Sequence, residues 1–332
     1  MYRIRKKRRI KTGLIMLAIV GAMILSVPVS DLFTPNVSAF LVSGLFNLSD
    51  KADAIRNPRT VPENVAVIRN IEYPSAFPDS TMDIYYPKSA AGRMPVVFWI
   101  HGGGWISGDK DGITYAPLLA EQGYVVACIN YALAPAYKYP SAVIQANDAL
   151  RYIVGHSSQY SMNVQKIFFA GDSAGAQIAS QMASLVTDTE AAVPLKLRPA
   201  IALNQIKGAL LYCGLYDIHS AVSTGFPFIR TFLWSYTGTK NIQNKISDEM
   251  STVNHITENY PPVFLTDGNA DWFAPQAKEL LKALQNRCVS VTALLFDGCR
   301  DKLSHEFQFD LKTSEAKQVL YSTIVFLNQN SK

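Results

Sequence analysis

Residues 171–175, with the sequence Gly-Asp-Ser-Ala-Gly, place a serine hydroxyl between two glycines. An apolar run at residues 167–170 precedes them, and apolar residues at helical spacing follow, which predicts a strand, a sharp turn and a helix. Such a turn exposes the Ser173 hydroxyl above a sheet and leaves the Ala174 amide at the helix N-terminus, where it can face an oxyanion. The pattern therefore indicates nucleophilic catalysis by Ser173.

A serine hydroxyl is a poor nucleophile near neutral pH, so it needs a base, and the base needs an acid that orients it. In a strand–helix architecture these residues follow in the order Ser, Asp or Glu, then His, each after a strand. Of the five histidines, His305 follows the last predicted strand, and we expect it to be the base. The acid is expected soon after residue 266. Asp271 is favoured there, because Asp267 directly abuts the strand and suits a turn cap. Asp297 is a more remote candidate.

Three successive glycines follow an early apolar run, in the sequence His-Gly-Gly-Gly-Trp at residues 101–105. Glycines let backbone amides approach a substrate carbonyl without a Cβ in the way. We therefore expect backbone amides of this loop to complete an oxyanion hole with the Ala174 amide. His101 is expected to organise this loop rather than to act as a base.

The body of the chain alternates predicted strands and helices, which is typical of a parallel sheet covered on both faces. Two alternating segments at residues 65–73 and 82–87 predict an antiparallel pair at its start. The other predicted strands are at 95–100, 124–130, 167–170, 207–213, 263–266 and 289–296, and the predicted helices at 115–122, 141–154, 174–186, 275–285 and 314–328. The sequence therefore predicts an α/β fold with a mostly parallel central sheet.

Four parts are expected along the chain. Residues 1–30 form a basic segment and an apolar one, residues 31–63 a linker or N-terminal cap with a short helix through 42–55, and residues 64–328 the catalytic domain. A long insertion at 217–260 carries a cluster of aromatic side chains; they are Phe226, Phe228, Phe232, Trp234 and Tyr236.

The N-terminus carries seven basic residues in its first eleven and no acidic residue before Asp31. A basic segment followed by an apolar run is typical of a secretory signal or a signal anchor. We expect an uncleaved anchor with the body outside the cytoplasm; the alternative is secretion after cleavage near residues 37–39. Without those seven, 24 basic residues stand against 26 acidic ones, so the net charge of +5 gives no support for a nucleic-acid surface.

The four cysteines give no disulfide framework. Cys128 and Cys213 lie in apolar, strand-like runs, where a thiol behaves as a small buried hydrophobe. Cys288 and Cys299 flank one predicted strand, whose ends lie roughly 20 Å apart at ~3.3 Å per residue, whereas a disulfide needs Cα atoms within about 7 Å. No Cys and His spacing suggests zinc.

Taken together, the His-Gly-Gly-Gly-Trp and Gly-Asp-Ser-Ala-Gly motifs, the stretch Tyr-Ala-Leu-Ala-Pro at residues 131–135 and the late Asp and His resemble the hormone-sensitive-lipase-like branch of the α/β-hydrolases. That branch holds esterases, lipases and arylformamidases, and the resemblance covers about residues 64–328. It implies a triad with an oxyanion hole, and a cap over the site for which residues 31–63 and a lid formed by the insertion at 217–260 are the candidates. The aromatic side chains of that insertion would either line an acyl pocket or anchor the lid to the body. The implied site residues are Ser173, Asp271 and His305, with the amides of Gly103, Gly104 and Ala174.

The resemblance implies hydrolysis of a small-molecule or lipid-like ester, through an acyl-enzyme and without a metal or organic cofactor. Short acyl chains or aryl esters are the expected substrates. Two alternatives remain. An amidase or peptidase would use the same residues, and a binding module would use the fold without catalysis.

Overall fold

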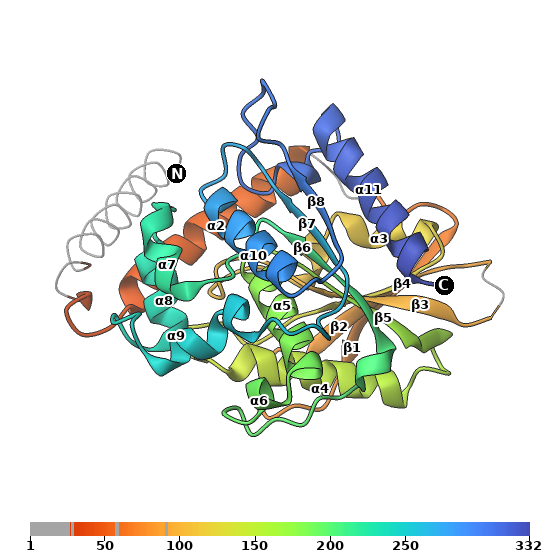
Figure 1. The fold of residues 1–332 in the computed structure, drawn as a ribbon, viewed down its shortest axis with the longest axis horizontal. Coiled ribbons are helices and arrows are strands. Elements are labelled where there is room, and N and C mark those ends of the chain that lie inside the picture. The colour runs from red at the N-terminus through yellow and green to blue at the C-terminus, as the bar shows by residue number, and fades with distance from the viewer. Residues whose placement is uncertain (1–26, 28–29, 57–59, 90–91) are drawn as a thin grey trace, which may run out of the picture.

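The computed structural model describes residues 27, 30–56, 60–89 and 92–332, and these residues build one eight-stranded sheet (Figure 1). Its strand order is β1-β2-β4-β3-β5-β6-β7-β8. β2 is antiparallel to both β1 and β4, and the pairs from β4 to β8 are parallel. The strands are β1 (Val65–Glu72), β2 (Thr81–Pro87), β3 (Met94–Ile100), β4 (Val125–Ile129), β5 (Met162–Asp172), β6 (Ile206–Tyr212), β7 (Val263–Asp267) and β8 (Val291–Leu295). The predicted α/β architecture is confirmed.

Helices cover both faces of this sheet, and the central strands are apolar on both sides for that reason. On β3, Phe98 and Ile100 point into one core while Val97 and Trp99 point into the other. The first core is covered by α4 (Ser141–Gly155), α5 (Ala174–Thr187) and α10 (Ala274–Asn286), and the second by α3 (Tyr115–Glu121) and α11 (Ser314–Asn330). Figure 1 shows α3 and α11 on the side of the sheet opposite α4.

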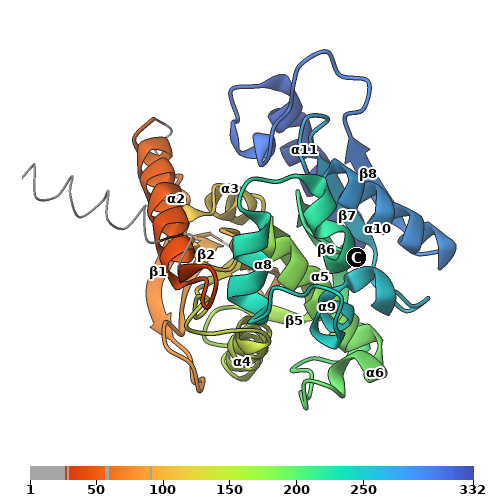
Figure 2. The ribbon, with the colours of Figure 1, turned by 90° about the vertical axis from the view of Figure 1, so that its left-hand side faces the viewer.

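A cap is assembled from two segments that lie far apart in the sequence. The insertion at 217–260 forms short helices, and α2 from the N-terminal region packs against one of them. Phe46 of α2 meets Phe232 of α8 edge to face, with ring centroids 5.6 Å apart, and Figure 2 shows the two helices side by side. The cap helices are α2 (Asn36–Arg56), α7 (Ile218–Ala221), α8 (Ile229–Thr237) and α9 (Lys245–Met250); a further short helix, α6 (Thr189–Ala192), follows α5.

Two predicted elements are longer in the structure than the sequence indicated. The helix expected at 42–55 begins at Asn36, whose amide is bonded to the Thr34 hydroxyl, and its first turns bury Ala39 and Val42 in the core. The strand expected at 167–170 is the end of β5, which starts at Met162, because its polar first half still pairs with β3. Buried apolar runs locate the centre of an element better than its ends.

The predicted membrane anchor falls almost wholly outside the described residues. Within the parts of the chain that the structure does describe, no helix is both long enough and apolar enough to cross a bilayer. The alternative cleavage site at residues 37–39 lies inside α2, where Ser38 and Ala39 are buried. All four cysteines are free thiols, and Cys128 and Cys213 are buried as expected.

Candidate active site

Ser173 stands at a tight turn between β5 and α5. Its φ of 51° and ψ of −119° are unusual for a residue other than glycine, and such strain is typical of functional positions. The two flanking glycines are required by close packing. A Cβ at Gly171 would lie 2.4 Å from Gly175, and a Cβ at Gly175 would lie 2.1 Å from the Ile100 carbonyl oxygen. The predicted strand–turn–helix is therefore present, and its geometry depends on both glycines.

His305 connects Ser173 to Asp271, although the three residues are far apart in the sequence. Its Nε2 lies 3.0 Å from Ser173 Oγ, and its Nδ1 lies 2.8 Å from Asp271 Oδ2. Asp271 is held in turn by the Phe273 amide, which donates to its Oδ1 at 2.9 Å. With the proton on Nδ1, Nε2 is free to accept a proton from the serine hydroxyl.

The charges around the imidazole favour its protonated form. Burial works to lower the pKa of His305, but the hydrogen bond with Asp271 and the charges of Glu306, Asp271 and Asp172 outweigh it, so this pKa lies above its ordinary value. Burial likewise works to raise the pKa of Asp271, and its bond to His305 instead brings that pKa below its ordinary value. The raised pKa of His305 and the lowered pKa of Asp271 both favour an imidazolium–carboxylate pair.

The glycine loop after β3 has a backbone that only glycine adopts readily. Gly103 and Gly104 have φ values of +102° and +59°, in the region that favours glycine. A Cβ at Gly103 would lie 2.2 Å from the Ser107 carbonyl oxygen, and one at Gly104 would lie 2.6 Å from the Phe232 ring. Side chains are excluded from both positions, so Gly103 and Gly104 present only backbone atoms between β3 and the cap.

Asp172, which the sequence analysis did not single out, ties this loop to the nucleophile turn. Its Oδ2 accepts the Gly102 amide at 2.8 Å, and its Oδ1 accepts Trp99 Nε1 at 2.8 Å. Burial raises the pKa of Asp172, against the lowering effect of these bonds and of His101. The sequence did show that Asp172 lies between a buried strand and Ser173, which could have marked it as a candidate. The residues that Asp172 contacts could not be predicted from the sequence.

The other candidate residues have different partners. His101 is buried, with Nδ1 2.7 Å from the Gly102 carbonyl oxygen and its ring stacked on Tyr131 at 4.3 Å, as a loop organiser would be. Asp267 Oδ1 accepts the Gly268 amide at 2.8 Å. Asp297 is exposed and forms an ion pair with Lys278.

Other histidines of the described chain lie in separate surroundings. His156 follows α4 and stacks on Tyr152, while His219 bonds Asp248 and His255 lies 3.6 Å from Asp188.

The aromatic side chains of the insertion make two kinds of contact, one with the His305 ring and one with the glycine loop. Phe226 lies against the His305 ring, with centroids 5.1 Å apart, and stacks on Phe273 at 4.6 Å. Tyr236 instead stacks on Trp105 at 5.1 Å and anchors α8 to the glycine loop. Together with Phe232 beside Gly104, Phe226 and Phe273 give the site an aromatic wall.

One group among the described residues has spacing that could suit a metal ion. The ligand atoms of Cys213, Asp271 and His305 lie within 4.8 Å of one another. However, Asp271 and His305 are hydrogen-bonded to each other, and burial raises the pKa of the Cys213 thiol, which donates to Gln308 Oε1 at 3.3 Å. A metal ligand must be deprotonated, so these residues fit a hydrogen-bonded network better than a metal site.

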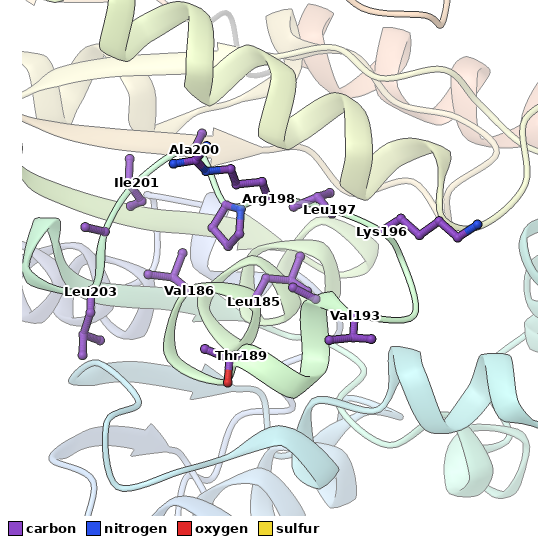
Figure 3. Close-up of a pocket in the computed structure, with 13 residues that line it drawn as sticks. Leu185, Val186, Thr189, Val193, Lys196, Leu197, Arg198, Ala200, Ile201 and Leu203 are labelled. Atoms are coloured by element: carbon purple, nitrogen blue, oxygen red, sulfur yellow. The ribbon is translucent and has the colours of Figure 1, made fainter.

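A separate cavity of about 680 Å³ lies beside the C-terminal end of α5, opposite the end that carries Ser173 (Figure 3). Leu185, Val193 and Leu203 are among its lining residues, with Lys196 and Arg198. No residue of the Ser173 site lines it.

Comparisons with known proteins agree with this geometry. The family model BD-FAE matches residues 82–284, which is more than half of the chain. An acetyl esterase of Salmonella dublin is 29% identical over 230 residues, which cover 65% of this chain and 67% of that protein. The crystal structure of esterase B from Lactobacillus rhamnosis, inhibited in the crystal, has a TM-score of 0.78 at 23% identity, covering 90% of this chain and 96% of that one.

A bacterial heroin esterase structure has a TM-score of 0.72 at 20% identity, covering 90% of this chain and 92% of its own. The fold is thus that of the α/β-hydrolase esterases. The chain belongs to the BD-FAE family, and the predicted hormone-sensitive-lipase-like α/β-hydrolase of the esterase class is confirmed. The catalytic role of each site residue stays a prediction.

Proposed function

We propose that this protein is a serine carboxylic-ester hydrolase. The observation that carries the proposal is the hydrogen-bonded series from Ser173 Oγ through the imidazole of His305 to Asp271, with separations of 3.0 and 2.8 Å. Its position beside a glycine loop in an esterase fold supports the same reaction. A hydroxyl, a base and an orienting acid in this order are what acyl transfer to serine requires.

In this mechanism His305 takes the proton of Ser173 as its Oγ attacks the acyl carbon. The carbonyl oxygen becomes an oxyanion, and the amides of Gly103, Gly104 and Ala174 stabilise it. His305 then gives the proton to the departing alcohol, which leaves an acyl-enzyme. Water, activated by the same imidazole, releases the acid. Asp271 holds the ring and stabilises its charge at both stages.

Esters with short acyl chains, or aryl esters, are the proposed substrates. Phe232 contacts the glycine loop at Gly104, and Phe226 and Phe273 lie against His305, so rigid aromatic rings border the reacting atoms. The similarity to an acetyl esterase supports a short acyl group.

The test is a series of p-nitrophenyl esters of rising acyl length, with the Ser173→Ala variant beside the unaltered protein. We expect kcat/KM to be greatest for the shortest chains, and Ser173→Ala to lose at least about 10⁴-fold in kcat. Ser290→Ala, which changes an exposed serine, is the matched control and should retain activity. Full activity and unaltered fluorophosphonate labelling of Ser173→Ala would refute the proposal. Faster cleavage of a matched p-nitroanilide would favour an amidase instead.

We also propose that the N-terminal region attaches the protein to a membrane, with the catalytic body outside the cytoplasm. The seven basic residues and the apolar run that follows them support this. Residues 36–49 of α2 contain no charge, and several large apolar side chains near the start of the described chain are exposed to solvent. These are Leu32, Phe33, Phe40, Leu45 and Leu48.

Sedimentation with anionic phospholipid vesicles tests this attachment. The full chain should sediment with the vesicles, and a variant with Phe40, Leu45 and Leu48 all changed to Ser should bind less if α2 also lies against the lipid. Sedimentation of neither protein would refute the proposal. Equal binding of both would assign it to the first thirty residues alone, and a change in oligomer size in the triple variant would indicate a second copy on this face.

A further inference from the structure

Glu306, the residue directly after the imidazole, has a backbone conformation that glutamate rarely adopts. Its φ is 59° and its ψ is 26°, in the left-handed region that favours glycine. Strain of this kind persists where the surrounding structure determines it, and it is concentrated at functional sites. The conformation belongs to the loop that carries His305, so the direction of the Glu306 side chain is set together with that of the base.

That direction brings the carboxylate to the reacting side of the imidazole. Glu306 Oε1 lies 3.8 Å from His305 Nε2, the nitrogen that faces Ser173. The same oxygen is 3.2 Å from the point that a Cβ on Gly102 would occupy, so it also borders the glycine loop. Because Nε2 must reach the oxygen of the departing alcohol, a group at this distance from Nε2 lies beside the alcohol portion of a bound ester.

The other acids around His305 are placed differently. Asp271 bonds Nδ1 on the far side of the ring, and Asp172 is buried and bonded to Trp99 and the Gly102 amide. The thiol of Cys213 is neutral because burial raises its pKa. The Glu306 side chain is 36% exposed, so among these acidic groups it is the one that solvent, and hence a substrate, can approach.

We propose that Glu306 determines substrate specificity by charge, disfavouring esters whose alcohol portion is anionic and favouring those whose alcohol portion is cationic. This inference depends on the proposed ester hydrolysis and names a substrate preference of the same site. A carboxylate within several ångströms of a substrate charge, in a partly solvated site, changes binding by about three- to tenfold. The effect falls with added salt, since the carboxylate is accessible to counterions.

The experiment compares three aryl acetates that differ in charge at one position: 4-acetoxybenzoate, its neutral methyl ester, and 4-acetoxyphenyltrimethylammonium. Ratios of kcat/KM are measured for the unaltered protein, for Glu306→Gln and for Glu306→Gly, which suits the left-handed backbone. In both variants the anion-to-neutral ratio should rise about three- to tenfold and the cation-to-neutral ratio should fall similarly. Glu258→Gln, an exposed glutamate on the loop before β7, is the matched control and should leave both ratios unchanged.

A second readout separates this electrostatic role from a structural one. The Glu306 carboxylate stabilises the imidazolium, so its loss should lower the pKa of His305. The acidic limb of the kcat/KM profile for the neutral ester should therefore move to lower pH in Glu306→Gln. Unchanged charge ratios in both variants would overturn the inference while leaving ester hydrolysis intact. Absence of hydrolysis of all three acetates by the unaltered protein would instead count against the proposed function.

Discussion

Asp267 and Asp271 lie four residues apart at the end of β7, and their surroundings drive their pKa values in opposite directions. Burial raises the pKa of Asp267 well above its ordinary value, and the neighbouring charge of Asp271 raises it further. Asp271 has the opposite shift because it is bonded to His305. Two carboxyls close together resist ionising at once, and here the surroundings favour the proton on Asp267 and the charge on Asp271.

The Asp267→Asn substitution should stabilise the protein increasingly as the pH rises. A carboxyl with a raised pKa in the folded state contributes most below its unfolded pKa of about 3.9, and this contribution is lost as the pH rises through the folded value. Asparagine does not titrate, so the Tm of the variant minus that of the unaltered protein should grow between pH 5 and pH 8. Asp297→Asn, at an exposed ion pair, is the control. A difference in Tm that stays constant with pH would contradict the assignment.

The pH dependence of catalysis should report the imidazole. Ester hydrolysis requires neutral His305, and the net effect of Asp271, Glu306 and Asp172 against burial raises its pKa. The acidic limb of kcat/KM is therefore expected above the ordinary imidazole pKa of about 6.5. A limb clearly below that value would show that the neighbouring carboxylates do not dominate. The measurement is a kcat/KM profile from pH 5 to pH 9 with a neutral ester.

For single residues, the sequence was informative where a proposed role depends on the order of residues and strands along the chain. Ser173, Asp271 and His305 could be selected because each follows a strand, and the structure brings their side chains within hydrogen-bonding distance. Asp172 and Glu306 could not be selected, because their contacts depend on which way each side chain turns, at the end of β5 for Asp172 and in a loop with positive φ for Glu306. Sequence periodicity carries no information about that direction.

Among the elements, α8 connects the cap to the glycine loop at two points. Phe232 lies against Gly104, and Tyr236 stacks on Trp105 with an interplanar angle of 9°. The sequence predicted an aromatic insertion but could not divide its residues between pocket and anchor, since both roles use the same residue types. The structure separates them by their contacts: Phe226, which precedes α8, lies against His305, whereas Tyr236 of α8 stacks on Trp105.

Gly104→Ala should reduce kcat strongly and leave the fold intact. The methyl group would lie 2.6 Å from the Phe232 ring and would occupy a backbone with φ of +59°, so the amide must move away from the carbonyl oxygen. Loss of one oxyanion donor typically costs about 10²- to 10³-fold in kcat. Gly123→Ala is the matched control, since it also has positive φ but meets nothing within 4 Å. Equal activity of the two variants would argue against an oxyanion role.

Tyr236→Ala should destabilise the anchored cap. Its ring is almost fully buried against Trp105 and Tyr139, and removing a buried aromatic side chain costs roughly 3–5 kcal/mol of unfolding free energy. The exposed Phe228→Ala substitution, on the same segment, should cost far less. Urea unfolding of both variants measures the difference, and similar midpoints would show that α8 is not anchored through this stack.

In the molecule as a whole, the core of the fold could be predicted because strand and helix patterns alternate from β3 to α11. What lay beyond prediction was the packing of segments remote in sequence, above all the contact between α2 and α8. The sequence of residues 31–63 has no pattern that indicates which other element of the chain they pack against. Their attachment follows from three-dimensional fit, with Ala39 and Val42 joining the main core.

A chain that begins at residue 31 should therefore have a higher Tm and a higher kcat than one that begins at residue 60. The shorter chain lacks α2, so Phe232 loses its contact with Phe46 and the support of the glycine loop is weakened. We expect a lower Tm and a lower kcat for the chain from residue 60, measured beside the chain from residue 31. Identical values for the two would show that α2 does not contribute to the site.

The order of α2, Ser173 and His305 along the chain has a consequence for biosynthesis. Translation produces α2 before the serine at 173, and that serine well before the histidine at 305. A nascent polypeptide still short of that histidine has a serine without a base. If Ser173 and His305 act as proposed, ester cleavage must await the synthesis of residue 305, and a chain that terminates before it is expected to be inert.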